Sequence, residues 1–235
     1  MTTSLPRSDH RSPRTLVDSA TSTLHDAILT GELSAGAPLR LGELASALGM
    51  SVMPVREALR RLAAIGLVEI VPHKGAWVRE LTAEDAEDTL DTRLALETLA
   101  IQRAAANFTE EYAQTAAVEL DRHVTAARRG DNVAARLAHT QFHFTIYQAS
   151  GSRWLLRALE PVWQNSERYR FAGPRRGSLS ASTREHRAIL DACTAHDPEA
   201  AVAALVNHLR RSHERILKNM DASGRATSDP AAPVH

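Results

Sequence analysis

The chain has 235 residues with 28 basic and 28 acidic side chains, so its formal net charge at neutral pH is zero. That length suits one large or two small domains, and the balanced charge excludes a polycation that binds nucleic acid over its whole surface. The single cysteine, Cys193, excludes an intrachain disulfide, and its apolar helical surroundings predict a buried bystander. No stretch approaches the roughly 20 apolar residues that span a bilayer, and no signal peptide opens the chain, so we expect a cytoplasmic protein with no membrane segment.

The N-terminal part of the chain begins with a polar, proline-punctuated arm. Residues 1–14 are basic and lack an apolar pattern, which predicts a disordered arm. Apolar residues then recur at helical spacing over residues 15–30, and Gly31 is a typical helix stop. We therefore expect the first ordered helix to begin near residue 15.

The stretch 41–79 has the pattern of two short helices followed by a β-hairpin. Apolar spacing predicts a helix over 41–48, with Gly49 just past its end. Ser51 is a candidate cap for a second helix, and Pro54 fits its first turn. After Gly66, residues 67–71 are strand-like, a Pro-His-Lys-Gly turn follows, and Ala-Trp-Val returns. The pattern predicts a winged helix-turn-helix domain over residues 15–80.

The second helix of this stretch has two distinct faces. Val55, Ala58, Leu59 and Leu62 lie three and four residues apart and form the expected buried face. The opposite face carries Val52, Met53, Arg56 and Arg60. A helix with exposed arginines suits the major groove of DNA, although a solvated helix face gives the same pattern.

Four fragments of this region resemble the DNA-binding domain of the GntR superfamily of bacterial transcription regulators. The fragments are AILTGEL (27–33), ELASALGMS (43–51), MPVREALRRL (53–62) and GLVEIVPHKGAWV (66–78). The resemblance implies that two groups of residues face DNA. They are Ser51, Val52, Met53, Arg56 and Arg60 at the recognition helix, and His73, Lys74 and Gly75 at the wing tip. Many relatives have Arg-Thr where this chain has Val52-Met53, so we expect a different base preference, with an apolar contact to a thymine methyl as one option.

From Thr82 to about residue 219 the chain shows helical patterns and no strand signal. Thr82-Ala-Glu-Asp is a capping signature, and Asp197-Pro198-Glu199 is a clear helix start. We expect helices over 83–107, 109–129, 132–149, 153–170, 180–195 and 198–219. Short connections between them favour an antiparallel bundle, which makes the whole protein mainly α. The bundle domain spans 81–220, and residues 221–235 are expected to be a disordered tail.

Four histidines of the predicted bundle could converge on one point. His139 and His143 are four residues apart and so share a helix face, and His186 and His208 lie beside apolar residues on the last two helices. Neutral imidazole suits zinc, nickel, copper or iron(II). The alternative from spacing alone is two surface histidines and two satisfied core ones.

The segment from Thr82 to Lys218 resembles the FCD ligand-binding domain of the FadR-type branch of the same superfamily. The matching fragments are DTRLALETLA (91–100), QFHFTIYQASGS (141–152) and REHRAILDACTAHDPEAAVAALVNHL (184–209). The family implies a divalent metal on one aspartate and three histidines. By position, His143, His186 and His208 are the three histidines, and His139 stands where the family usually has aspartate. Four neutral nitrogens favour zinc or nickel, and a lost fourth ligand is the alternative.

The resemblance also implies a small carboxylate effector gripped by the metal. Arg93 could hold a carboxylate in bidentate fashion, although a salt bridge to Glu97 is an equal alternative. Arg136 and Asn165 are further candidates for effector contacts, and for Asn165 a solvated helix face explains the pattern nearly as well. Because protonated imidazole cannot ligate, we expect metal binding to weaken as the pH falls through about 6.5.

These patterns together predict a metabolite-responsive DNA-binding regulator, most often a repressor in this family. We expect a homodimer on a palindromic operator, because two identical winged domains can read half-sites related by a two-fold axis. A metal-dependent hydrolase that uses the histidine cluster is the alternative function. It lacks the glutamate that zincins place beside the first histidine of their helical pair, and it leaves the winged domain idle. A metal that only stabilises the bundle is a third possibility, and it is compatible with DNA binding.

Overall fold

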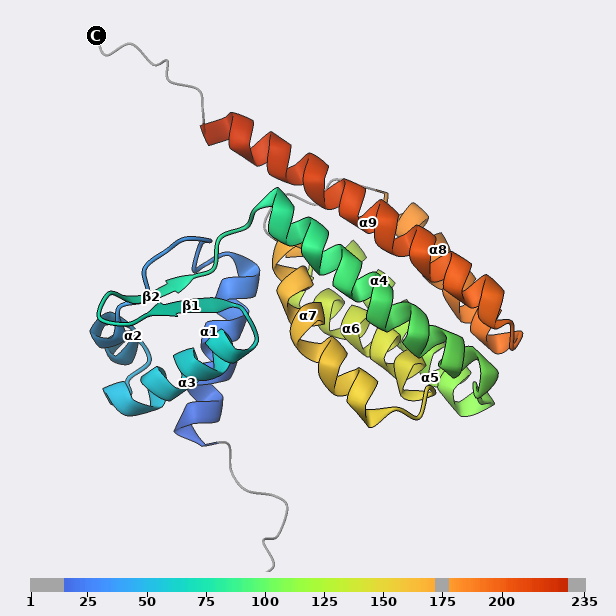
Figure 1. Ribbon diagram of the computed structural model, residues 1–235, viewed down its shortest axis with the longest axis horizontal. Helices are drawn as coiled ribbons and strands as arrows, with labels where there is room; N and C mark the ends of the chain where they lie inside the picture. Colours follow the sequence, from blue (N-terminus) through green and yellow to red (C-terminus); the bar gives the residue numbers. More distant parts are fainter. Residues whose placement is uncertain (1–14, 172–177, 228–235) are drawn as a thin grey trace, which may run out of the picture. The chain divides into compact units, whose positions relative to one another are not determined.

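The computed structural model describes residues 15–171 and 178–227 and divides the chain after Glu80 into two compact units (Figure 1). The arm expected at residues 1–14 lies outside the described residues. The first unit has the element order of the expected winged helix-turn-helix. Its elements are α1 (Leu16–Thr30), α2 (Leu41–Ala47), α3 (Val52–Ala64), β1 (Val68–Val71) and β2 (Gly75–Val78).

Local sequence explains where these short helices begin and end. Thr15 caps α1 by accepting a hydrogen bond from the Asp18 backbone N–H, while the Asp18 side chain accepts one from the Thr15 N–H. Gly31, with φ of 81°, ends α1 in the left-handed conformation. Ser51 is at the N-cap position of α3, but its side chain accepts no capping hydrogen bond, so that expectation was wrong. Pro54 is the third helical residue and has no N–H to donate, which removes the usual partner.

One apolar core holds α3 and the hairpin in place within the first unit. The buried face of α3 is the one expected, with Val55, Ala58, Leu59 and Leu62 all buried. They pack in a cluster with residues of α1, such as Leu24, and of the hairpin. β1 and β2 pair antiparallel, and the 36–39 loop adds backbone hydrogen bonds to β2. The helix α3 therefore packs on the apolar core of its own unit.

The second unit is a bundle of helices, as expected (Figure 1). Its described elements are α4 (Ala83–Ala106), α5 (Glu110–Arg128), α6 (Asn132–Gln148), α7 (Arg153–Phe171), α8 (Leu179–Thr194) and α9 (Pro198–Thr227). The expected boundaries agree to within one residue except at the end of α9. The backbone of α9 continues to Thr227, so the tail expected from residue 221 was wrong up to that point. The sequence has no proline to stop the helix before Pro230, and residues 228–235 lie outside the described part.

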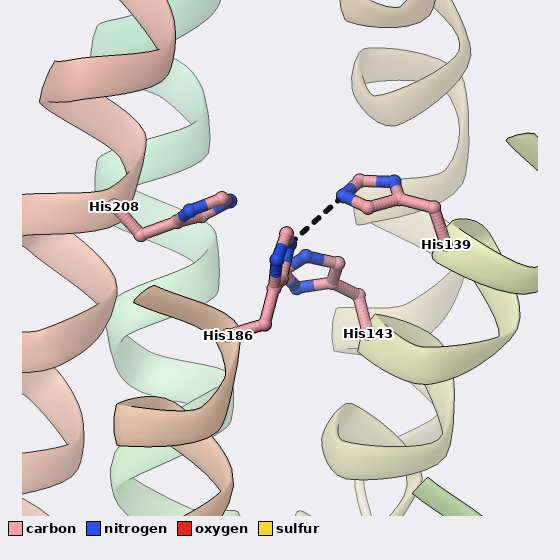
Figure 2. Close-up of side chains that lie close together, drawn as sticks. All are labelled: His139, His143, His186 and His208. Atoms are coloured by element: carbon pink, nitrogen blue, oxygen red, sulfur yellow. Dashed lines mark hydrogen bonds between the residues drawn. The ribbon is translucent and has the colours of Figure 1, made fainter. Parts of the chain in front are cut away.

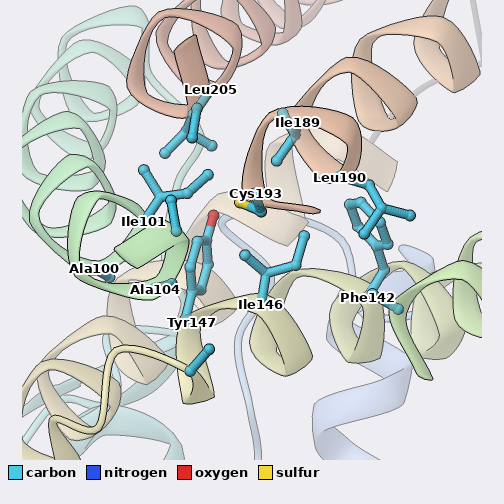
Figure 3. Packing of buried hydrophobic residues seen from close by; sticks show 14 of the residues in the cluster. Ala100, Ile101, Ala104, Phe142, Ile146, Tyr147, Ile189, Leu190, Cys193 and Leu205 are labelled. Atoms are coloured by element: carbon cyan, nitrogen blue, oxygen red, sulfur yellow. The ribbon is translucent and has the colours of Figure 1, made fainter. Parts of the chain in front are cut away.

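Aliphatic and alanine side chains fill the interior of the bundle (Figure 3). Ile101 of α4, Ile146 of α6, Ile189 of α8 and Leu205 of α9 belong to one buried cluster. Cys193 lies in the same cluster, where burial raises the pKa of its thiol to about 12 and keeps it protonated. Across residues 15–171 and 178–227, no helix is both long enough and apolar enough to cross a membrane.

Candidate nucleic-acid interface and metal centre

The structure places the candidate DNA-facing residues on the exposed face of α3. Met53 is 64% exposed, and Ser51, Val52, Arg56 and Arg60 are exposed as well. This face lies opposite the one that packs on the core, so helical geometry alone separates the two sets. The apolar side chains at the start of α3 can contact a thymine methyl but cannot donate to guanine.

Ion pairs engage two of the three arginines on α3. Arg61 Nη1 is 2.8 Å from Oδ1 of Asp18, so this arginine ties α3 to α1. Arg60 Nη1 is 3.6 Å from Oε2 of Glu57, an exposed pair that contributes little free energy. Arg56 is thus the leading candidate for a contact to DNA.

The wing tip is a tight turn between β1 and β2. The backbone N–H of Lys74 donates to the carbonyl of Val71 at 3.1 Å, and His73 adopts a φ of 62°. His73, Lys74 and Gly75 are all exposed, and Gly75 has a φ of 132°, a value that glycine tolerates best. The turn presents an imidazole and an ammonium group to solvent.

In the second unit, three helices bring four imidazoles together (Figure 2). His139 and His143 come from α6, His186 from α8 and His208 from α9. Each offers a ring nitrogen, and these atoms all lie within 4.8 Å of one another. All four side chains are buried, with exposed fractions of 2% or less. The alternative with two surface histidines is therefore wrong.

Hydrogen bonds fix the tautomer of three of these histidines. His186 Nδ1 is 2.8 Å from the carbonyl of Ser182, and a carbonyl only accepts, so Nδ1 carries the proton. His208 Nδ1 donates in the same way to Oε2 of Glu185, at 3.0 Å. In each case the Nε2 atom is left unprotonated, and that of His186 lies within hydrogen-bonding distance of His139 Nε2, at 3.1 Å.

His143 follows the same rule through a tyrosine. The Tyr147 hydroxyl donates to Oε2 of Glu97 at 2.5 Å, so its oxygen can accept from His143 Nδ1 at 3.2 Å. His143 Nε2 is buried and has no hydrogen-bond partner among the described residues. A buried acceptor without a partner costs about 1–3 kcal/mol, which a bound cation would offset. This arrangement, with Nδ1 bonded outward and Nε2 directed inward, is typical of metal-ligating histidines.

His139 differs from the other three. Its Nε2 lies 3.1 Å from Nε2 of His186, a separation that one ion with bonds of about 2.1 Å can span. However, Nη1 of Arg170 from α7 lies 2.8 Å from His139 Nδ1 and 2.5 Å from its Nε2. The guanidinium cation of Arg170 therefore touches the imidazole of His139.

Two protein-family models match the chain, one in each unit. A family model described as "Bacterial regulatory proteins, gntR family" matches residues 16–78, and the "FCD domain" model matches residues 88–211. The chain belongs to the GntR family and carries an FCD domain. It is a DNA-binding transcriptional regulator and not an enzyme, so the hydrolase alternative is not favoured.

The proteins similar to this chain include a probable regulator of sugar utilisation. The chain is 36% identical over 182 residues to the "Probable D-xylose utilization operon transcriptional repressor" of Paenarthrobacter nicotinovorans, covering 77% of this chain and 80% of the relative. Among solved structures, Escherichia coli McbR/YncC superposes with a TM-score of 0.77 at 23% identity, over 88% of this chain and 99% of that one. A metal-free FCD domain of another regulator gives a TM-score of 0.50 at 21% identity, over 60% and 98% of the two chains. At these identities the structures support the fold alone.

Within this GntR-family regulator, burial keeps the imidazoles neutral. Desolvation first, and then neighbouring positive charge, lower the pKa of His139, His143 and His186 well below 6.5. Burial likewise lowers the pKa of His208 to about 4, although Glu185 acts against the shift. In the folded protein, protons therefore compete with a metal for these nitrogens at a lower pH than they do for an exposed imidazole.

The three candidate effector contacts have different surroundings. Arg93 Nε is 2.5 Å from Oε1 of Glu97 in a buried ion pair, which is the alternative weighed from sequence. Asn165 accepts from Arg168 Nε at 2.9 Å and donates to Thr89 at 3.3 Å. Arg136 is buried on α6 one turn before His139.

Sequence reasoning missed several residues around the histidine cluster. His123 of α5 donates from Nδ1 to the Ala135 carbonyl at 2.8 Å, and its ring centroid is 5.3 Å from that of His139. His123 follows the buried Leu120 by three residues, so helical periodicity could have placed it inward. Tyr147 follows His143 by four residues on α6, so helical spacing could have paired them. Glu185 and Arg170 carry no such signal, because their contacts with the cluster join different helices.

Proposed function

We propose that the protein represses transcription in the cytoplasm, binding a palindromic operator as a homodimer. Arg56 would contact base edges or phosphates, with Val52, Met53 and the wing tip beside it. The support is the exposed face of α3 on a well-packed unit. One recognition helix covers few base pairs, so two copies related by a two-fold axis give the required selectivity.

We propose also that the FCD domain holds one divalent metal, zinc or nickel, on His143, His186 and His208, with His139 as the fourth ligand. The observation that carries this proposal is the set of outward Nδ1 hydrogen bonds, which leaves three buried Nε2 lone pairs facing one point. Neutral nitrogen donors suit these borderline ions better than magnesium or calcium. When bound, the metal supplies a Lewis-acidic position for an oxygen of the effector.

The proposed effector is a small carboxylate, with Arg93, Arg136 and Asn165 as candidate contacts. Arg93 and Ser212 line a cavity of about 20 Å³ between α4, α7 and α9, which is room for about one water molecule. An effector that uses this cavity must therefore move side chains. A carboxylate that binds one arrangement of the dimer better than another would shift the affinity for operator DNA.

Two measurements test the proposal. Elemental analysis of protein purified without chelators should give one zinc or nickel per chain, and His143→Ala, His186→Ala and His208→Ala should lose it. Fluorescence polarisation with upstream intergenic DNA should show binding that small carboxylic acids change only in metal-loaded protein. Metal that raises the melting temperature but leaves effector response unchanged would assign it a purely structural role. A monomer mass in light scattering, with DNA bound one to one, would contradict the homodimer.

A further inference from the structure

His139 is the member of the histidine cluster whose surroundings oppose a bound cation, because it already contacts Arg170. His143, His186 and His208 direct unprotonated Nε2 atoms inward, whereas His139 already has a positive neighbour. Guanidinium nitrogens can only donate hydrogen bonds, so the close contact with Arg170 uses the electron pair of His139. A metal ligand needs that same kind of electron pair.

The surroundings of Arg170 show how its side chain is held. Besides His139, Nη1 lies 3.7 Å from Oε1 of Glu167, and Nη2 donates to the Ser212 hydroxyl at 3.5 Å. Glu167 is 3% exposed and lies 4.0 Å from His139 Nδ1, so a buried carboxylate partly balances the guanidinium charge. The Arg170 side chain is 21% exposed, whereas the four histidines are almost fully buried. Arg170 is therefore the member of this group that can move toward solvent.

We propose that Arg170 and the metal compete for His139, so that Arg170 sets the affinity of the fourth coordination position. This inference rests on the proposed metal site. In the metal-free protein the guanidinium covers His139, and metal binding displaces it toward α9 and solvent. Two effects of Arg170 oppose metal binding. The guanidinium must release the lone pair of His139, and its positive charge is repelled by a nearby divalent ion. Arg170 is a positioning residue here, since it acts through His139.

Replacing Arg170 should change metal affinity in the opposite direction from replacing a residue that only supports the site. A residue that only stabilises the site would weaken metal binding when removed. Removing Arg170 should instead strengthen metal binding, provided that His139 is present. Loss of His139 should in turn remove most of the effect of Arg170, because the two groups share one interaction.

A double-mutant cycle tests this inference directly. Zinc and nickel are titrated into Arg170→Met, His139→Ala, the double variant and the parent, all carrying Trp77→Phe and Trp154→Phe. Trp163 then reports binding alone, since its ring stacks on His139 with a centroid distance of 5.4 Å. Arg157→Met is the matched control, because Arg157 is an exposed arginine on the same helix.

Arg170→Met should tighten metal binding roughly tenfold or more, and the same change in the His139→Ala background should have at most about a twofold to threefold effect. Unchanged or weaker binding by Arg170→Met, in protein whose melting temperature shows a native fold, overturns the inference while leaving the metal site standing. Arg170→Gln provides the same test if the methionine variant does not fold. Failure of the parent and of every variant to bind zinc or nickel would overturn the metal site as well.

Discussion

The Nδ1 atom of His208 on α9 lies 3.0 Å from Oε2 of Glu185 on α8, one residue before another cluster histidine. Arg215 binds the same carboxylate at 3.1 Å through both terminal nitrogens. Burial alone would raise the pKa of Glu185, but hydrogen bonds from His208 and Arg215 outweigh it and lower the pKa to about 2. The carboxylate is thus ionised at neutral pH and fixes the ring of His208.

Replacing Glu185 by alanine should weaken metal binding by roughly 10–100-fold, because His208 loses the partner that fixes its tautomer. Glu185→Gln should cost less, since its amide oxygen can still accept. Isothermal titration with zinc measures the effect, and Asp191→Asn, an exposed carboxylate on the same helix, serves as control. Equal affinities for Glu185→Ala and the control would show that this contact does not support the site.

Tyr147→Phe should destabilise the FCD domain by about 1–3 kcal/mol, because the hydroxyl is the shared partner of Glu97 and His143. Burial raises the pKa of Tyr147 well above 10, so the hydroxyl is protonated and donates to Glu97. Urea unfolding measures the loss, with Tyr112→Phe as a control at a half-buried tyrosine of α5. We expect weaker zinc binding in the same variant. A wild-type unfolding midpoint would contradict the shared hydrogen bonds.

Arg56→Ala should weaken operator binding by roughly 1–3 kcal/mol, as expected for a lost base or phosphate contact. If Arg56 contacts phosphate, the slope of log affinity against log salt should also fall by about one unit. Fluorescence polarisation at several salt concentrations separates these two contacts. Arg103→Ala, which removes an exposed arginine from α4, should change neither quantity. An equal loss of operator affinity in Arg56→Ala and Arg103→Ala would indicate a general effect of charge.

The metal-free FCD domain should become less stable as the pH falls below about 6.5. The folded state lowers the pKa of the four cluster histidines, so the unfolded chain binds more protons in this range and the free energy of unfolding decreases. The contribution of His208 is complete above pH 6.5 and is lost as the pH falls toward its pKa of about 4. Each imidazole contributes up to about 1.4 kcal/mol per pH unit within that window.

Urea unfolding between pH 7 and 4, with and without zinc, measures this dependence. Bound zinc should raise the stability at each pH, because it binds only the folded state. His208→Gln removes one titrating group and should reduce the slope. A flat profile down to pH 5 would contradict neutral, buried imidazoles.

The sequence alone determined where the helices and strands lie and which residues share one face of a helix. Helical spacing separated Val55 and Leu59, which are buried, from Met53 and Arg56, which are exposed. It also placed His139 and His143 on one face of α6. These inferences succeed because periodicity and capping are local properties of the chain. Ser51 shows their limit, because the proline three residues later removed the donor its side chain needed.

Tertiary structure alone decided which polar groups touch. Arg93 could pair with Glu97 or hold an effector, and only the folded bundle, in which Tyr147 also donates to Glu97, shows the buried ion pair. Arg170 is 31 residues from His139, and Glu185 is 23 residues from His208, so no spacing rule relates either pair. The burial that lowers the pKa of the imidazoles likewise exists only once α6, α8 and α9 have packed together. Desolvation and hydrogen bonds between helices depend on distances that the order of residues along one helix does not contain.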